Sequence, residues 1–320
     1  MQTDEFIARL KCYAGRTPRP ADFDACWARA LDELSQVRPQ VELRRAAFQA
    51  PFADCYEMYF TGVRQARIHA RLLRPKRKAA RPGPAVVMFH GYSGNCGEFS
   101  DKLQYVAAGF TVAALDARGQ GGLSDDTGGH HGPTWHGQLI RGLENATPDD
   151  LLFRHIFLDA AELVKLITAL PDVDPNRIGV TGISQGGGLS LAAAALVPEV
   201  KLAVVAFPFL CDYRKAWEME LPTEAYRELR EFFRWFDPRH EREEEIFTRL
   251  GYIDVQNLAP RIRAKVLMAT GLADNICPPE TQFAAYNKIK SPKSVKFYPD
   301  FGHEMLPEFA DMTYLEMLTL

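Results

Sequence analysis

The sequence lacks an uninterrupted apolar run of the roughly 20 residues that a membrane-spanning helix needs. Its six cysteines are scattered, with neither a C-x-x-C pair nor zinc-type spacing, so we expect reduced thiols and no structural metal. The opening stretch, MQTDEFIARLK, has no apolar core of the kind found in secretory signals. We therefore expect a cytoplasmic protein without membrane contacts.

The sequence also lacks a strong excess of charge. Its 38 Lys and Arg face 41 Asp and Glu, giving a formal net charge of −3 at pH 7. This balance argues against nucleic acid or an anionic membrane as the main partner. The basic run RPKRKAARPG (74–83) contains two prolines and lies between two predicted strands, which favours a solvated loop. Internal repeats and low-complexity segments are absent.

What the sequence does have is enough chain for a large core, with 320 residues of which 47% are hydrophobic. A chain of this size buries roughly three quarters of its unfolded surface, so neither a disulfide nor a metal is needed for stability. We predict one α/β domain over residues 1–320, with an N-terminal extension over about 1–75 and a helical insertion over about 207–260.

The N-terminal extension contains a helix and three strand-like runs. In ADFDACWARALDELSQ (21–36), Phe23, Trp27, Leu31 and Leu34 recur at helical spacing. The strand-like runs are VELRRAAF (41–48), CYEMYF (55–60) and ARIHARLL (66–73). In the last of these, apolar residues alternate with Arg67, His69 and Arg71, which predicts a half-buried outer antiparallel strand.

From residue 84 the pattern changes to continuous apolar runs separated by helical segments. The runs predict strands buried on both faces of a mainly parallel sheet: PAVVMF, FTVAALD, RIGVTG, KLAVVAF, AKVLMAT and SVKFYP. Residues 147–171 predict one long helix with Thr147 as N-cap and Pro148 at its first position. The insertion at 207–260 is interpreted as a cap over the carboxyl ends of the strands, with a simple pair of surface helices as the alternative.

The motif Gly182-Ile183-Ser184-Gln185-Gly186 fits G-x-S-x-G, with an apolar strand before it and an alanine-rich helix after it. In that context the small flanking residues allow a turn so tight that the serine hydroxyl is exposed at its tip. A capping serine would not require glycine on both sides. The pattern therefore predicts Ser184 as a nucleophile.

A serine nucleophile needs a general base oriented by a carboxylate, in the chain order serine, acid, histidine. Only His240 and His303 follow Ser184, and His303, in FGHE just past the last predicted strand, is the better placed. Asp274 follows the strand AKVLMAT by a short loop and is the favoured acid, with Asp212 as its competitor.

The oxyanion formed during attack needs two backbone N–H donors. One is expected from Gln185, directly after the nucleophile, and the other from the loop HGYSGN, where Tyr92 is the candidate. Gly91 and Gly94 allow the backbone of this loop to approach the substrate.

Three further features have a structural interpretation beside a functional one. Arg118, in LDARGQGG, either bridges carboxylates beneath the site or faces solvent. GGHHGPTWH offers His130, His131 and His136 but no carboxylate or thiolate at ligand spacing, so no metal site is predicted. Cys277 lacks the glycine-flanked turn and is interpreted as a small thiol lining the pocket.

Together these motifs make the chain resemble the acetyl xylan esterase and cephalosporin-C deacetylase family of α/β-hydrolases. Three marks carry the resemblance most specifically: RGQ at 118–120, GxSQG at 182–186 and the pair His303-Glu304. The resemblance extends over nearly the whole chain. It implies an α/β-hydrolase fold, with a mainly parallel sheet flanked by helices.

The resemblance also implies an activity and a set of site residues. It supports Ser184, Asp274 and His303 as the catalytic triad, and Tyr92 and Gln185 as the oxyanion donors. It makes Arg118, Gln120 and Glu304 structural supports of the site. Tyr92 and Cys277, with Phe207 and Pro208, are the expected lining of an acyl pocket.

Members of this family are cytosolic deacetylases of acetylated sugars and cephalosporin C that use no metal or cofactor and commonly form hexamers. We expect the same of this chain, with a small acetylated sugar or antibiotic ester as substrate. After His303-Glu304 the chain continues MLPEFADM where the family usually has glycines, so the pocket shape there is not carried over. The alternatives are a peptidase of the prolyl-oligopeptidase kind and a catalytically silent binding protein of the same fold.

Overall fold

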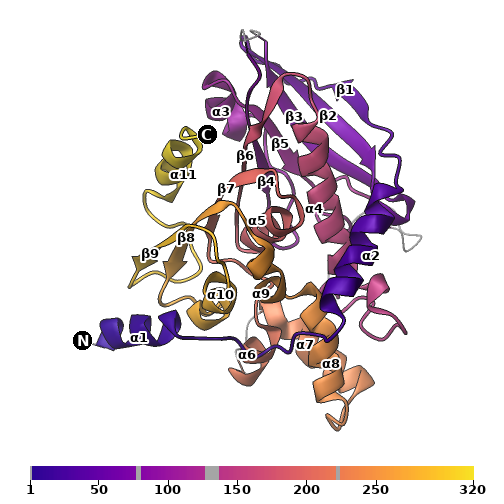
Figure 1. Ribbon diagram of the computed structural model, residues 1–320, viewed down its shortest axis with the longest axis vertical. Coiled ribbons are helices and arrows are strands. Elements are labelled where there is room, and N and C mark those ends of the chain that lie inside the picture. The colour runs from indigo at the N-terminus through magenta and orange to yellow at the C-terminus, as the bar shows by residue number, and fades with distance from the viewer. Residues whose placement is uncertain (1, 77–80, 127–136, 221–223) are drawn as a thin grey trace.

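The computed structural model describes residues 2–76, 81–126, 137–220 and 224–320, and in them a nine-stranded sheet forms the centre of the molecule (Figure 1). The strand order is β1-β2-β3-β5-β4-β6-β7-β8-β9. The strands are β1 (Glu42–Arg45), β2 (Ala53–Thr61), β3 (Arg67–Pro75), β4 (Gly83–Phe89), β5 (Thr111–Leu115), β6 (Val173–Ile183), β7 (Val200–Ala206), β8 (Lys265–Gly271) and β9 (Lys293–Tyr298).

Strands β4 to β9 run parallel, whereas β1, β2 and β3 pair antiparallel at one side of the sheet. β3 joins the two parts because it pairs antiparallel with β5, with Leu72 opposite Ala113. Residues of β5 are buried throughout, as expected of a strand covered on both faces. The predicted mainly parallel sheet with N-terminal antiparallel strands is confirmed.

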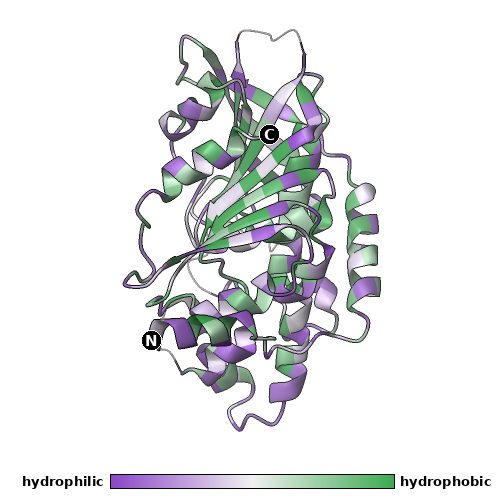
Figure 2. Ribbon diagram, turned by 60° about the vertical axis from the view of Figure 1, so that its left-hand side comes forward, coloured by the Kyte–Doolittle hydropathy of each residue, from purple (hydrophilic) through white to green (hydrophobic). Residues whose placement is uncertain are grey.

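Helices cover both faces of the sheet and create two apolar cores (Figures 1 and 2). The larger core lies under α2 (Phe23–Ser35), α4 (Leu152–Thr168), α5 (Gln185–Leu196), α9 (Val255–Leu258) and α10 (Pro279–Tyr286). The smaller core lies under α3 (Leu103–Ala107) and α11 (Phe309–Met317). α1 (Gln2–Lys11) packs beside α10. Among the described residues, every helix is too short or too polar to cross a lipid bilayer.

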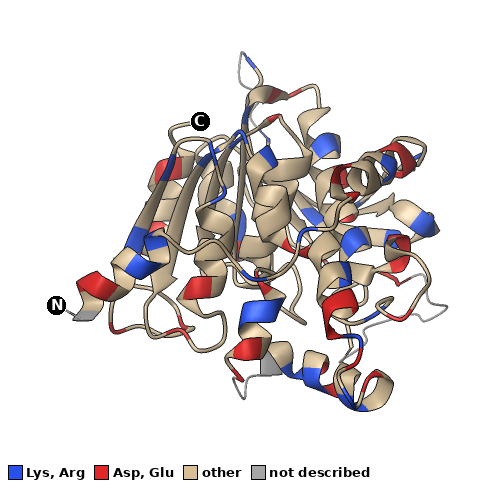
Figure 3. Ribbon diagram, turned by 60° about the horizontal axis from the view of Figure 1, so that its bottom comes forward, with Lys and Arg blue, Asp and Glu red and all other residues tan. Residues whose placement is uncertain are grey.

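The predicted insertion contributes α6 (Tyr213–Glu218), α7 (Glu224–Phe236) and α8 (Glu243–Leu250), which pack together beyond the carboxyl ends of the strands (Figure 1). Trp217 and Phe233 meet at 4.6 Å between ring centroids and form part of the contact between α6 and α7. Figure 3 shows basic and acidic residues intermixed on the outer helices, while the inner strands β4 and β5 carry no charged residue. Short 3-10 turns complete the fold: η1 (Val63–Gln65), η2 (Ser100–Lys102), η3 (Pro148–Asp150), η4 (Gly251–Ile253) and η5 (Ala259–Arg261).

The prediction of one continuous helix over residues 147–171 is wrong near its start, where the short turn η3 is followed by a separate helix, α4. Thr147 does accept a hydrogen bond from the Asp149 N–H, at 3.2 Å, but this caps only the turn η3. Leu151 then has ψ 125°, and α4 begins at Leu152, whose N–H donates to the Arg141 carbonyl. A tertiary hydrogen bond thus takes the place of a helical one.

Three strand predictions also need correction. β1 covers only 42–45 of the predicted 41–48 and is exposed, as is common for short edge strands. β3 is not an outer strand, because β2 covers one side of it and β5 the other, and its His69 is buried. β9 is the opposite edge of the sheet and is only partly buried. Of the basic run at 74–83, residues 77–80 lie outside the described part of the chain.

Candidate active site

Ser184 occupies a strained turn between β6 and α5. Its φ is 58° and its ψ is −122°, a conformation that L-residues rarely adopt. The close contacts of the turn leave no space for side chains beside it: a Cβ on Gly182 would lie 2.3 Å from the carbonyl carbon of Gly186, and one on Gly186 would lie 2.0 Å from the Phe89 oxygen. The Ser184 N–H donates to the Ala206 carbonyl at the end of β7, which fixes the turn to the sheet.

His303 and Asp274 stand in line with the Ser184 hydroxyl. His303 Nε2 is 3.0 Å from Ser184 Oγ, and His303 Nδ1 is 2.9 Å from Asp274 Oδ2. The three residues follow β6, β8 and β9, whose carboxyl ends share one edge of the sheet. With a carboxylate at Nδ1, that nitrogen carries the proton, which leaves Nε2 free to accept the serine proton.

Asp274 is held in place independently of His303. Its side chain is buried, and its Oδ1 accepts hydrogen bonds from the N–H groups of Ile276 at 2.9 Å and Cys277 at 2.8 Å. Its Oδ2 is therefore left to face the imidazole. The competing candidate, Asp212, is also buried but lies with the N-terminal segment, where it accepts from the N–H groups of Arg16 and Thr17.

Two glutamines connect the loops that carry the candidate oxyanion donors. The side chains of Gln120 and Gln185 exchange hydrogen bonds of 2.8 and 2.9 Å. The Gln120 oxygen also accepts from the N–H of Ser93, the residue after Tyr92, at 3.0 Å. Gln185 opens α5, so its own N–H belongs to a helical first turn, where N–H groups have no intrahelical partner. This pairing gives a physical reason for glutamine in both RGQ and GxSQG.

His90 stabilises the loop after β4 through hydrogen bonds at both of its ring nitrogens. Its Nε2 accepts from the Ala117 N–H at 3.0 Å, so its Nδ1 must carry the proton that bonds to the Gly91 carbonyl at 2.7 Å. Burial lowers the pKa of His90, which keeps this neutral tautomer in place. The histidine therefore acts as a spacer between two loops and does not face Ser184.

The sequence left open whether Arg118 bridges carboxylates or faces solvent. In the structure Arg118 is fully buried. Its guanidinium forms a bidentate pair with Asp159 of α4, with both N–O distances at 2.6 Å, and also donates to the Val63 carbonyl. Burial raises the pKa of Asp159, and the arginine opposes that rise. The pair fixes the loop that carries Gln120 to α4.

Cys277 and Phe207 lie against the reactive side chains. Burial and the Asp274 carboxylate raise the pKa of the Cys277 thiol, while a hydrogen bond with Ser184 works against that rise. The thiol is therefore protonated and in contact with the nucleophile. The Phe207 ring lies 4.5 Å from the His303 ring, centroid to centroid. Pro208 is buried and packs next to Gly187 of α5.

Glu304 is exposed, and its carboxylate accepts from the Gly302 N–H at 3.1 Å. It therefore contacts the loop that carries His303. His130, His131 and His136 lie outside the described residues.

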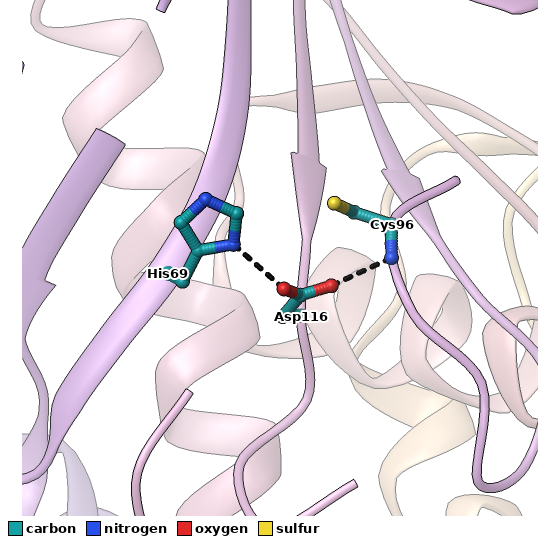
Figure 4. A group of neighbouring side chains, drawn as sticks. All are labelled: His69, Cys96 and Asp116. Carbon is teal, nitrogen blue, oxygen red and sulfur yellow. Dashed lines mark hydrogen bonds and ion pairs between the residues drawn. The ribbon is translucent and has the colours of Figure 1, made fainter. Parts of the chain in front are cut away.

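A second polar cluster lies beside the loop after β4, where His69, Cys96 and Asp116 approach within 4.8 Å (Figure 4). Asp116 Oδ2 is 2.6 Å from His69 Nδ1, and its Oδ1 accepts from the Cys96 N–H. His69 Nε2 faces Glu57 at 2.8 Å, so both ring nitrogens already have carboxylate partners. These residue types can bind a metal, but here they bond to one another and link β3 to the loop after β4.

The charge of this cluster is fixed by its contacts. Burial would raise the pKa of Asp116, but hydrogen bonds from His69 and the Leu123 N–H hold that pKa below its usual range. Burial and the nearby Asp116 raise the pKa of the Cys96 thiol. An ionised carboxylate and a neutral thiol result.

Sequence reasoning missed two residues that contact side chains of this site. Asp159 could have been identified from the sequence, because a charged residue within the apolar pattern of α4 needs a partner such as Arg118. Glu228 could not have been identified, because it lies in the charged segment YRELREFF, which has the pattern of a solvated helix. The structure places Glu228 at the Tyr92 hydroxyl, 3% exposed.

The arrangement is that of an activated serine. The hydroxyl, the imidazole and the carboxylate are within hydrogen-bonding distance in series, and two loops that can supply N–H donors are held together beside them. Such a set can attack an acyl carbonyl and stabilise the resulting oxyanion.

Comparison with known proteins agrees with this geometry. The chain matches the acetyl xylan esterase (AXE1) family over residues 1–319. It is 29% identical over 311 residues to acetyl esterase Axe7A of Xylanibacter ruminicola, covering 95% of this chain and 67% of that protein.

Two solved structures are closely similar over the whole chain. Acetyl xylan esterase 1 from Thermoanaerobacterium sp. JW/SL YS485 superposes with a TM-score of 0.94 at 55% identity, covering 98% of both chains. An acetyl xylan esterase from Paenibacillus sp. R4 superposes with a TM-score of 0.90 at 35% identity, again covering 98% of both chains. The resemblance inferred from the motifs is confirmed: the chain belongs to the acetyl xylan esterase family, has the α/β-hydrolase fold and is a carboxylic ester hydrolase.

Proposed function

We propose that this protein is a serine esterase that removes acetyl and other short acyl groups from acetylated sugars through an acyl-enzyme. The observation that carries the proposal is the Ser184–His303–Asp274 alignment, at 3.0 and 2.9 Å, in a chain of the acetyl xylan esterase family.

In acylation, Ser184 Oγ attacks the ester carbonyl while His303 Nε2 takes its proton. Asp274 holds the proton of Nδ1 and stabilises the imidazolium as it forms. The backbone N–H groups of Tyr92 and Gln185 stabilise the oxyanion, each by about 3 kcal/mol. When the tetrahedral intermediate collapses, the C–O bond to the sugar breaks and His303 gives its proton to the leaving alkoxide.

In deacylation, a water molecule replaces the alcohol. His303 takes a proton from the water as its oxygen attacks the acyl carbonyl, and a second oxyanion forms in the same place. Collapse breaks the bond to Ser184 Oγ, which recovers its proton from His303. Acetate leaves and the free enzyme returns. Each proton transfer uses His303 Nε2, and the chemistry requires no cofactor or metal.

The proposed substrates are acetylated xylo-oligosaccharides and esters of the cephalosporin C kind, both with a two-carbon acyl group. Three relatives support the acetyl group, since their names describe acetyl esterases or acetyl xylan esterases. The buried Cys277 thiol beside Ser184 and the Phe207 ring beside His303 are consistent with a narrow acyl site. Tyr92 and Pro208 complete the proposed lining.

We further propose that the protein acts in the cytoplasm as a homohexamer, as members of the family commonly do. The two solved acetyl xylan esterases match 98% of this chain, which supports the proposal that the family's assembly is kept. Light scattering at micromolar concentration should give six times the mass of one chain. A monomer would contradict the assembly without affecting the chemistry.

The direct test is hydrolysis of acetylated xylo-oligosaccharides, p-nitrophenyl acetate and cephalosporin C by the wild type and by Ser184→Ala. A fluorophosphonate should label the wild type only. Failure of the wild type to release acetate from any ester would refute the proposal. Including an aminoacyl p-nitroanilide tests the peptidase alternative, which faster cleavage of the anilide would support.

A further inference from the structure

The Tyr92 side chain makes a buried contact with the cap that the sequence does not reveal. Its hydroxyl donates to Glu228 Oε1, although the residues are 136 positions apart. Glu228 lies in α7 and is 3% exposed, and its Oε2 accepts the Leu139 N–H at 2.7 Å. Each carboxylate oxygen therefore has its own donor.

The rest of Tyr92 is also fixed. Its ring stacks on Phe153 of α4 at 6.4 Å and meets Phe209 edge-on at 5.6 Å. On the following residue, the Ser93 N–H bonds to Gln120. The Tyr92 peptide is thus anchored through the backbone by Gln120 and through the side chain by Glu228.

The charges favour this bond. Burial raises the pKa of the Tyr92 phenol, and the Glu228 carboxylate raises it further, so the phenol stays protonated and donates. A bond to a buried carboxylate is stronger than one to a neutral acceptor. Glutamine at 228 would weaken the link, because its oxygen would serve the Leu139 N–H and its NH₂ group would donate a neutral bond to the Tyr92 oxygen, in place of the bond to a carboxylate.

We propose that Glu228 is a positioning residue of the esterase reaction, which holds the Tyr92 backbone N–H in the oxyanion hole from the helical cap. This inference rests on the function proposed above. The donor itself is a backbone group, so the phenol has no direct part in the chemistry and acts only as the link. The cap and the oxyanion hole consequently move as one unit.

The test compares Tyr92→Phe, Glu228→Gln, the double variant and Glu231→Gln. Tyr92→Phe removes only the link, because the backbone N–H remains. Glu231→Gln is the matched control, since Glu231 lies on the same helix but pairs at the surface with Arg227. For each variant, kcat and KM for p-nitrophenyl acetate, Ki for phenylboronic acid and Tm would be measured.

Loss of one oxyanion donor costs about 10²- to 10³-fold in kcat. A misplaced donor should cost less, so Tyr92→Phe, which removes the link, should lower kcat by about 10- to 100-fold, and Glu228→Gln, which weakens it, should lower kcat by a smaller factor, with KM within about twofold in both. Phenylboronic acid, whose adduct imitates the tetrahedral intermediate, should bind more weakly by a similar factor. The double variant should be no worse than Tyr92→Phe alone, because both substitutions act on the same link. Glu231→Gln should behave as wild type.

A folded Tyr92→Phe with wild-type kcat and boronate affinity would overturn the inference, as would losses that multiply in the double variant. If Glu228→Gln does not fold, Tyr92→Phe decides alone. The proposed function fails in a different way: either the wild type is inactive or Ser184→Ala is as active as wild type, and this inference then falls with it.

Discussion

Replacing Asp274 by asparagine should inactivate the enzyme while leaving it folded. Asp274 Oδ1 accepts the Ile276 and Cys277 N–H groups at 2.9 and 2.8 Å. In the variant, the amide oxygen must keep this position, because the NH₂ group would otherwise face two donors. The NH₂ group then faces His303 Nδ1 and forces that nitrogen to accept.

The consequence is the wrong tautomer of His303. With Nδ1 accepting, the proton moves to Nε2, which is 3.0 Å from Ser184 Oγ and can no longer take the serine proton. The same substitution in a Ser-His-Asp protease lowers kcat by about 10⁴-fold, and we expect a similar loss here. The amide oxygen of the Asp274→Asn variant keeps both backbone bonds, so the free energy of unfolding should fall by only about 1–2 kcal/mol.

The assay is the turnover of p-nitrophenyl acetate, with Tm measured on the same samples. Asp212→Asn serves as comparison, because Asp212 holds Arg16 and Thr17 by their N–H groups and lies apart from His303. It should lower Tm and leave kcat of the folded enzyme nearly unchanged. Asp274→Asn with more than about a tenth of wild-type kcat, or an Asp212→Asn more damaging to kcat, would refute the reasoning.

Three further predictions concern the nucleophile, the acyl pocket and the buried ion pair. Ser184→Ala should keep its Tm and lose at least about 10⁴-fold in kcat, and retained turnover would contradict the assignment of the nucleophile. In an acyl series, kcat/KM should fall from acetyl through butyryl to octanoyl, because overpacking a rigid pocket costs about 1–3 kcal/mol, or about one to two orders of magnitude in rate. Cys277→Ala should flatten that profile, whereas an optimum at octanoyl in the wild type would exclude a narrow pocket. Arg118→Met should lower the free energy of unfolding by about 3–5 kcal/mol in urea denaturation, since it leaves Asp159 as an unpaired buried charge. Arg44→Met, at an exposed ion pair, is the control and should change the free energy of unfolding far less; equal losses would contradict the role of burial.

That Ser184, Asp274 and His303 lie close together was predictable, because each follows the end of a strand. Ser184, Asp274 and His303 each follow an apolar run, and parallel strands bring their carboxyl ends to one edge. Glycine on both sides of Ser184 added a local geometric signal. The hydrogen-bond distances within the triad depend on how the loops pack, which no spacing in the sequence encodes.

Other features depended on contacts between distant segments. The alternating pattern around His69 predicts a solvent-facing histidine, but Asp116 and Glu57 provide partners that make its burial favourable. The helix expected from Thr147 breaks because the Arg141 carbonyl takes the N–H of Leu152. In each case a tertiary partner outweighs the local preference.

The antiparallel pairing of β3 with β5 limits how far this enzyme can be shortened. A chain beginning at Gly83 would keep Ser184, Asp274, His303 and all six parallel strands, and would look like a minimal hydrolase. It would also turn the apolar strand β5 into an open edge, which other chains can join. Asp116, whose Oδ1 holds the Cys96 N–H, would lose the His69 ring that now faces its Oδ2. Trimming the N-terminal strands for engineering would therefore yield an aggregating protein with a loosened loop after β4, so a useful library should begin upstream of β2.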